Sequence, residues 1–182
     1  MLDRADVDTD QIMPKQFLKR IERTGYGEFL FFDWRKDPDF ELNRPEAQGA
    51  RILVAGRNFG CGSSREHAAW GLQDYGFEAI VAPSFSDIFK SNCAMIGLLT
   101  VELDEADVRE LLDRAPEQAT IDLERRIVVL PSGREAPFSI PDDIRERLLN
   151  GWDEIALTER RMDEIERYER ERERTGPDVL AL

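Results

Sequence analysis

The chain has 182 residues, 41% of them hydrophobic, which is enough for one domain with a hydrophobic core. Its formal charge of −13, from 25 basic and 38 acidic residues, argues against a general attraction to nucleic acid or anionic membranes. No apolar run approaches the roughly 20 residues that cross a bilayer, and the first residues lack the layout of a signal peptide, so we expect a soluble cytoplasmic protein.

The first half of the chain leads from a loop into alternating strands and helices. Residues 36–49 contain Pro38 and Pro45 and few periodic apolar positions, so we expect a loop there. Beyond it, the pattern predicts strands at 52–55, 79–82 and 98–103, a helix at 64–75, and two further helices capped by Ser84 and Asp104. This βαβαβα order predicts a parallel sheet, which binds ligands at the carboxyl ends of its strands.

The second half of the chain predicts a hairpin followed by helices. Residues 119–123 and 127–130 have the pattern of two strands of a β-hairpin, and Pro141 and Gly151 bracket a short helix. The charged run at 159–174 predicts a solvated helix packed through a thin apolar stripe of Met162, Ile165 and Tyr168. We therefore expect one α/β domain spanning residues 1–182, with a charged C-terminal helix at about 158–175.

The most informative segment is residues 58–67, with the sequence NFGCGSSREH, because it connects a predicted strand to a predicted helix. Gly60 and Gly62 let the backbone approach a ligand closely. Ser63 and Glu66 fit the S-x-x-E capping box, which would make Ser63 the N-cap and leave backbone N–H groups of the first helical turn free for an anion. Arg65 adds a guanidinium that can bind a carboxylate through two hydrogen bonds.

A purely structural interpretation of the same segment is also open. The serine would then only cap the helix, the glycines would only permit a tight turn, and Arg65 would only pair with Glu66 or Glu78. Cys61 and Cys93 are the only cysteines and His67 is the only histidine, too few for a four-ligand zinc site without carboxylates or for a self-contained iron–sulfur cluster. Cys93 lies among apolar neighbours, so we expect it to be a buried small hydrophobe, and we expect His67 to be structural.

Taken whole, segment 58–67 resembles the signature of the small subunits of 3-isopropylmalate dehydratase, in the aconitase superfamily. The likeness to that family runs from about residue 6 to residue 168. Four further segments are similar to the family: 6–15, 32–35, 82–93 with 97–99, and 149–151. The resemblance implies a swivelling β/β/α domain of the aconitase type, with a partly parallel sheet, flanking helices and a β-hairpin.

The resemblance also implies a reaction, and it implies which catalytic groups lie in this chain and which lie in a partner subunit. The reaction is a dehydration and rehydration that interconverts 2-isopropylmalate and 3-isopropylmalate in leucine biosynthesis. Matched to the family's motif, Ser63 would be the catalytic base, and Gly62, Ser64 and Arg65 would bind the substrate. Loss of hydroxide needs a Lewis acid, in this superfamily a [4Fe–4S] cluster, which we expect in a large partner subunit and not in this chain.

The family places substrate specificity in the segment after the N-terminal motif, here residues 17–27. The candidate residues are Leu18, Lys19, Arg20, Thr24 and Tyr26. The apolar side chains of Phe17, Leu18 and Phe29 favour an isopropyl group. The cations Lys19, Arg20 and Arg23 leave open a tricarboxylate substrate, unless they point to solvent.

Some features depart from the family's usual pattern. The chain begins five residues before Asp6, whereas relatives usually have an additional N-terminal strand, so either that strand is absent or the assigned start is late. Ala69 and Thr100 stand where the family often has proline. A related hydro-lyase acting on homoaconitate, citraconate or dimethylmalate is the alternative function, and a non-catalytic anion-binding module is the alternative from another class.

Overall fold

The computed structural model describes residues 1–22 and 24–172 and contains two compact units, Met1–Gly151 and Trp152–Leu182. Within the described residues, every strand belongs to the first unit. The assignment of residues 1–182 to one domain stays a prediction.

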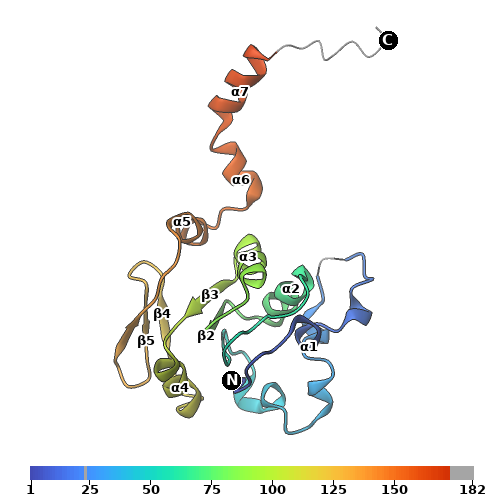
Figure 1. Cartoon of the computed structure of the whole chain (residues 1–182), viewed down its shortest axis with the longest axis vertical. Helices are drawn as coiled ribbons and strands as arrows, with labels where there is room; N and C mark the ends of the chain where they lie inside the picture. Colours follow the sequence, from blue (N-terminus) through green and yellow to red (C-terminus); the bar gives the residue numbers. More distant parts are fainter. Residues whose placement is uncertain (23, 173–182) are drawn as a thin grey trace. The chain divides into compact units, whose positions relative to one another are not determined.

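A parallel three-stranded sheet lies at the centre of the first unit (Figure 1). Its strands stand in the order β1-β2-β3: β1 (Ile52–Val54), β2 (Ala79–Ala82) and β3 (Leu99–Glu102). In the register of the sheet, Leu53 lies opposite Ile80, and Val81 lies opposite Val101. The predicted parallel sheet is therefore confirmed, with β1 and β3 shorter than the sequence pattern indicated.

Successive residues of these strands face two different hydrophobic cores, because side chains alternate across a strand. Leu53 and Ile80 belong to the core that also contains buried residues of α2 (Glu66–Tyr75) and α3 (Asp87–Ile96). Val54 and Val81 belong to a second core, which is completed by α4 (Glu105–Asp113) and by the other sheet. The parallel sheet is thus covered on both faces.

The second sheet is antiparallel and contains the predicted hairpin. Its strands stand in the order β4 (Thr120–Asp122), β5 (Ile127–Val129) and β6 (Glu135–Pro137). The pairing of β4 with β5 confirms the hairpin. Strand β6 was not predicted, because three residues ending in proline carry little strand signal. Helix α5 (Asp142–Asn150) begins after Pro141 and ends at Gly151, as expected.

The N-terminal part consists of short helical segments. Helix α1 (Thr9–Ile12) begins with a capping box in which the Asp8 side chain accepts from the Gln11 N–H. Five 3₁₀ turns follow before the first strand: η1 (Lys15–Phe17), η2 (Gly27–Phe29), η3 (Trp34–Lys36), η4 (Glu41–Asn43) and η5 (Pro45–Ala47). The expected loop at 36–49 is therefore a chain of turns.

The second unit contains helices α6 (Glu154–Glu159) and α7 (Met162–Glu171). The predicted charged helix corresponds to α7, and residues 173–175 of that prediction lie outside the described residues. In its apolar stripe, Met162 and Tyr168 are 47% and 64% exposed, and Ile165 is half-buried. The expected packing through this stripe stays a prediction.

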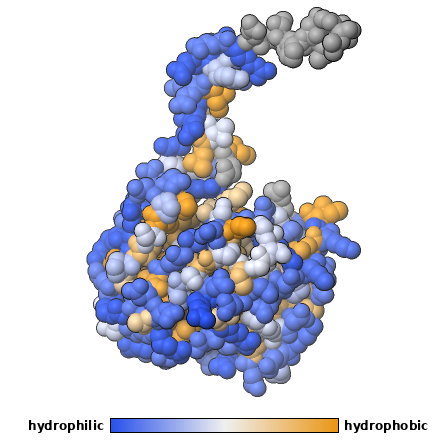
Figure 2. Space-filling model, viewed as in Figure 1, coloured by the Kyte–Doolittle hydropathy of each residue, from blue (hydrophilic) through white to orange (hydrophobic). Residues whose placement is uncertain are grey.

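The surface of the first unit that faces the viewer in Figure 2 is largely hydrophilic, with hydrophobic side chains in small groups. Across the described part of the chain, no helix combines the length and the apolar character needed to cross a membrane.

Candidate functional site

The turn at residues 58–67 is held in place by the N-terminal segment, which runs parallel to it. The Gly60 N–H donates to the Val7 carbonyl at 2.8 Å, and the Thr9 N–H donates to the Cys61 carbonyl at 2.9 Å. The Thr9 hydroxyl donates to the Ser63 carbonyl at 2.7 Å. The first of the segments similar to the family therefore lies directly beside Ser63.

The segment after β2 holds the opposite side of the same turn. The Phe59 N–H donates to the Ser84 carbonyl at 3.1 Å, and the Ser86 N–H donates back to the Phe59 carbonyl at 3.2 Å. The Ser86 hydroxyl also donates to the Gly60 carbonyl at 2.9 Å. Three segments that are remote in sequence thus meet at this turn.

The cap of α3 differs from the expectation. Ser86 is the N-cap, and its hydroxyl accepts from the Phe89 N–H. The predicted cap, Ser84, instead accepts a hydrogen bond from the Asn58 N–H at 2.9 Å. The prediction of Ser84 as the cap was wrong, because its hydroxyl connects the loop after β2 to the turn after β1.

Gly60 is required by close packing as well as by its backbone conformation. Its φ of +75° lies in the left-handed region, which disfavours side chains. A Cβ at this position would stand 2.2 Å from Cγ of Phe89. The ring of Phe89 therefore lies against the backbone of the turn, and α3 can approach only because residue 60 is a glycine.

Ser63 is not the N-cap of α2, so that prediction was wrong. The N-cap is Arg65, with extended φ and ψ of −142° and 108°, and the first helical residue is Glu66. The bond from Thr9 holds the Ser63 carbonyl outside the helix. The side chains of Ser63 and Ser64 are exposed, and neither hydroxyl makes a hydrogen bond within the described residues.

Backbone donors are nevertheless available at this turn. The N–H groups from Gly62 to His67 donate to no acceptor within residues 1–22 and 24–172. Consecutive free N–H groups beside a helix N-terminus attract anions, because their dipoles point outward from the backbone. The predicted anion site thus has its donors, although the start of the helix lies further along than expected.

Arg65 makes a two-pronged ion pair with Asp10. Its Nη2 lies 2.8 Å from Oδ2 of Asp10, and its Nη1 bonds to Oδ1. The hydrogen bonds from the guanidinium hold the pKa of the Asp10 carboxyl below its usual value. The alternative partners named from the sequence are not used, since Glu78 pairs with Arg51. Two of the five guanidinium N–H donors are engaged, which leaves three for another acceptor.

A small surface depression brings these groups together. Its lining includes Gly62, Ser63, Ser64 and Arg65, which were all predicted as site residues, and it also includes Asn92 from α3. Arg65 is only 14% exposed, so its guanidinium is partly shielded from water. The depression thus combines two free hydroxyls, a guanidinium and backbone donors, a set that suits an anionic ligand.

The predicted specificity residues lie elsewhere. Leu18 is partly buried after η1, while Lys19, Arg20 and Thr24 are exposed, and none of them lines the depression within the described chain. The Arg20 guanidinium lies 4.9 Å from the ring centroid of Phe29. Arg23 lies outside the described residues.

Tyr26, the fifth specificity candidate, is fully buried. Its ring centroid is 5.2 Å from that of His67 and 5.8 Å from that of Trp70. Its hydroxyl has no hydrogen-bond partner among the described residues. Burial lowers the pKa of His67, which favours a neutral imidazole packed among aromatic rings.

The cysteines are poorly suited to metal binding or nucleophilic chemistry. Burial raises the pKa of Cys61, with the Asp8 carboxylate as the next cause, and burial also raises the pKa of the fully buried Cys93. Both thiols are therefore held protonated at neutral pH. In the part of the chain that the structure describes, no three His, Cys, Asp or Glu side chains are grouped so that they could hold a metal ion.

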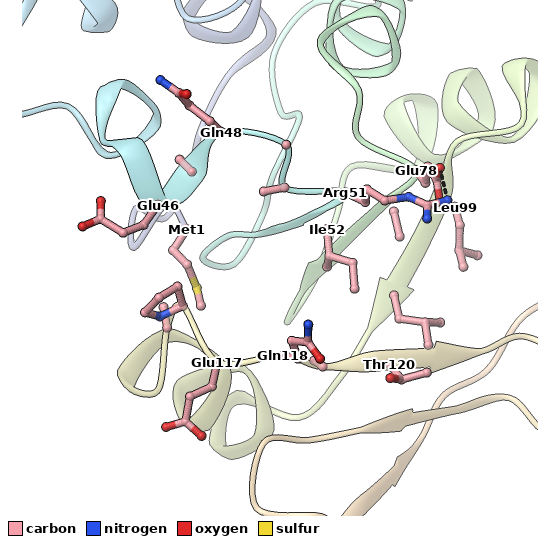
Figure 3. A pocket seen from close by; sticks show the side chains of 18 of the residues that line it. Met1, Glu46, Gln48, Arg51, Ile52, Glu78, Leu99, Glu117, Gln118 and Thr120 are labelled. Carbon is pink, nitrogen blue, oxygen red and sulfur yellow. Dashed lines mark hydrogen bonds and ion pairs between the residues drawn. The ribbon is translucent and has the colours of Figure 1, made fainter.

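A cavity of about 1070 Å³ is separate from this turn (Figure 3). It is lined by Ile52, Ala79 and Leu99, which are the first residues of the three parallel strands. Turn 58–67 instead follows the carboxyl end of β1, where ligands of parallel sheets bind. We therefore assign the candidate site to the smaller depression, because it lies at that end of the sheet and places serine hydroxyls beside a guanidinium.

Comparison with known proteins places this chain in a family. Residues 1–106 match the aconitase C-terminal domain. The chain is 59% identical to the 3-isopropylmalate dehydratase small subunit of Rubrobacter xylanophilus, over 98% of this chain and 93% of the relative. The chain belongs to the family of 3-isopropylmalate dehydratase small subunits. The small subunit of Geobacillus kaustophilus is 57% identical, over 93% of this chain and 90% of the relative.

A solved member of the 3-isopropylmalate dehydratase family has the same fold. The crystal structure of 3-isopropylmalate dehydratase from Methanocaldococcus jannaschii superposes with a TM-score of 0.66 at 26% sequence identity. The match covers 90% of this chain and 93% of that one. The predicted α/β fold of the aconitase type is thereby confirmed.

Two residues at the site were missed by the sequence analysis. Asp10 lies within the N-terminal motif and Asn92 within the second crossover, so the resemblance included both segments. It gave no sign of which side chains turn toward Ser63, because that depends on how remote loops pack. A polar residue at an inner position of an amphipathic helix is the one signal that pointed to Asn92.

Proposed function

We propose that this chain is the small subunit of a 3-isopropylmalate dehydratase, a hydro-lyase that interconverts 2-isopropylmalate and 3-isopropylmalate in leucine biosynthesis. The observation that carries the proposal is the convergence of Ser63, Ser64, Arg65 and free backbone donors in one depression at the carboxyl end of β1. We expect the reaction to take place in the cytoplasm.

Arg65 and the backbone donors bind the carboxylates of the substrate. A substituted malate is a dianion, and the net charge of this chain is −13, so binding depends on a local concentration of donors. The three guanidinium N–H groups that Asp10 does not use are available for a carboxylate. Ser64 and the N–H of Gly62 complete this grip.

Ser63 removes the proton from the carbon next to a carboxylate. A serine hydroxyl is a weak base, so its alkoxide must be stabilised. Asp10 largely neutralises the charge of Arg65, because both oxygens of the carboxylate bond to the guanidinium. The stabilisation therefore depends mainly on the unpaired N–H groups of residues 62–67, in the same turn as Ser63.

The large subunit supplies what this chain lacks. With Cys93 fully buried and the Cys61 thiol held protonated, these residues do not fit a [4Fe–4S] cluster, so we propose that the cluster belongs to the partner. The exposed hydroxyls of Ser63 and Ser64 also fit a half-site that a second protein covers, because catalysis by an alkoxide requires that bulk water be excluded.

Residues 17–27 remain our proposal for the segment that selects the substrate. Leu18 supplies apolar surface, and the exposed side chains of Lys19, Arg20 and Thr24 can meet either the substrate or the partner in the assembled enzyme. Tyr26 would act by fixing the segment, since its ring is buried against His67 and Trp70.

The test is anaerobic reconstitution of this chain with a candidate large subunit, followed by assay of a panel of substituted malates. The expected result is interconversion of the isopropylmalates by the complex, and no activity or iron–sulfur absorbance for the chain alone. Visible iron–sulfur absorbance in the chain purified without a partner would contradict the proposal that the cluster belongs to the large subunit. Preferential turnover of homoaconitate, citraconate or dimethylmalate would show that the proposed substrate is wrong and that the chain still belongs to a hydro-lyase.

A further inference from the structure

Asn92 occupies an inner position of α3 that is otherwise apolar. The buried residues of this helix are Phe89, Asn92 and Cys93, and they form one inward stripe. Asn92 is only 9% exposed, yet its carboxamide makes no hydrogen bond within the described chain. Among the described residues, the polar side-chain atom that is buried from water and also lacks a partner is the Tyr26 hydroxyl, so the carboxamide of Asn92 still reaches the surface at the depression, where a ligand can meet it.

The other asparagines satisfy their amides within the chain. Asn43 donates to the carbonyls of Arg35 and Asp37 at 2.9 and 2.7 Å. Asn58 donates to the Asp6 carboxylate, and Asn150 donates to the carbonyl one turn earlier in its helix. The exception is therefore Asn92, and it is also the asparagine that lines the depression containing Ser63, Ser64 and Arg65.

We propose that Asn92 is a substrate-binding residue whose carboxamide N–H donates to a carboxylate oxygen of the substrate. This inference rests on the proposed function. The charged side chain that lines the depression with it is the guanidinium of Arg65, which only donates, so the bound group offers acceptor oxygens, and an amide can turn its NH₂ toward them. Helix α3 thus adds a donor for the substrate to those that Arg65 and the backbone of the turn supply.

If Asn92 binds the substrate, its truncation should lower substrate affinity without lowering the stability of the fold. A structural asparagine loses stability when it is truncated, because its partners are left unsatisfied. Asn92 has no partner in the free chain, so Asn92→Ala should leave the melting temperature unchanged or slightly raised. The substrate, by contrast, loses a hydrogen bond to a charged group, worth a factor of about 10 to 100 in binding.

The experiment compares Asn92→Ala with Asn43→Ala, each reconstituted with the large subunit and assayed with 2-isopropylmalate. We expect Asn92→Ala to raise KM by about 10-fold or more at nearly unchanged kcat and unchanged Tm, since uniform binding is lost. Asn43→Ala should lower Tm and leave KM unchanged.

An unchanged KM in Asn92→Ala, or a fall in its Tm as large as that of Asn43→Ala, overturns the inference. Asn92→Leu, which fills the same space with apolar atoms, provides a second variant and should show the same rise in KM without loss of stability. Failure of the proposed function is distinct, because the wild-type complex would then convert none of the isopropylmalates.

Discussion

The ion pair of Arg65 with Asp10 fixes the direction of the guanidinium before any substrate is bound. Both prongs of the guanidinium are occupied, and only 14% of the Arg65 side chain is exposed. A partly shielded pair costs desolvation, and about half of Asp10 remains in water, so its net effect on stability is small. Its use is therefore geometric, since a prepositioned cation loses less entropy when the substrate binds.

Arg65→Lys is expected to lower kcat/KM by about 10-fold or more, because lysine keeps the charge and loses the planar fork. The pKa of Asp10 should rise toward its ordinary value in the same variant, since the guanidinium hydrogen bonds are what lower it. Steady-state kinetics of the reconstituted enzyme and an NMR titration of the Asp10 carboxyl would measure the two effects. Arg51→Lys, at the exposed pair with Glu78, is the control. Equal kinetics for the two variants would remove Arg65 from the site.

Ser63→Ala separates the chemical role of Ser63 from a structural one. The Ser63 hydroxyl caps no helix and makes no bond within the described residues, so stability should change by less than about 0.5 kcal/mol. Loss of a general base should lower kcat by about 10²- to 10⁴-fold. The control is Ser91→Ala, an exposed serine on the neighbouring helix α3. Normal turnover by Ser63→Ala would rule the base assignment out.

At the scale of elements, the meeting of α3 with the turn depends on Gly60. Gly60→Ala combines a left-handed φ with a Cβ placed 2.2 Å from the Phe89 ring, for a cost of roughly 2–4 kcal/mol. Gly133→Ala has a similar φ of +84° and open space around it, so it should cost only about 1–2 kcal/mol. Chemical denaturation of both variants measures the difference. Equal losses would mean that the contact between ring and backbone carries no cost.

Periodic elements and the N-cap of α4, Asp104, could be predicted from the sequence, whereas the caps of α2 and α3 could not. Strand β2 was predicted at its observed bounds, because a fully apolar run with a closing proline has few alternatives. The caps of α2 and α3 were assigned to Ser63 and Ser84, and both serines serve tertiary contacts instead. A capping motif reports a local preference, and hydrogen bonds from remote segments can override it.

At the scale of the whole molecule, the fold class and the family could be recognised from motifs, since each motif is continuous in sequence, while the choice of residues 58–67 as the site stays a prediction. The partner of Arg65 could not be recognised, because Asp10 lies 55 residues away. The same holds for Asn92, whose role depends on how α3 docks onto the turn. Pattern analysis therefore finds the segments that make a site and leaves the contacts between them to the structure.

Truncation after Gly151 should leave a folded protein, because both hydrophobic cores consist of residues from the first unit. A circular dichroism melt should show one cooperative transition close to that of the full chain. Truncation after Ile140 is the contrasting variant, since it also removes Ile144 and Leu148, which pack against the second core. A non-cooperative melt after the first truncation would show that residues beyond 151 are needed for folding.

The parallel pairing of the N-terminal segment with the turn also has a kinetic consequence. Thr9 reaches Ser63 across 54 residues, and Asn58 reaches Ser84 across 26. Contacts between such distant segments form more slowly than local ones, because the entropy of closing a long loop is lost before any of these contacts stabilises the chain. During synthesis, the hydrogen bonds from this turn to Ser84 and Ser86 can form only after those residues have left the ribosome. We therefore expect a nascent chain that ends before Ser86 to lack an assembled anion site.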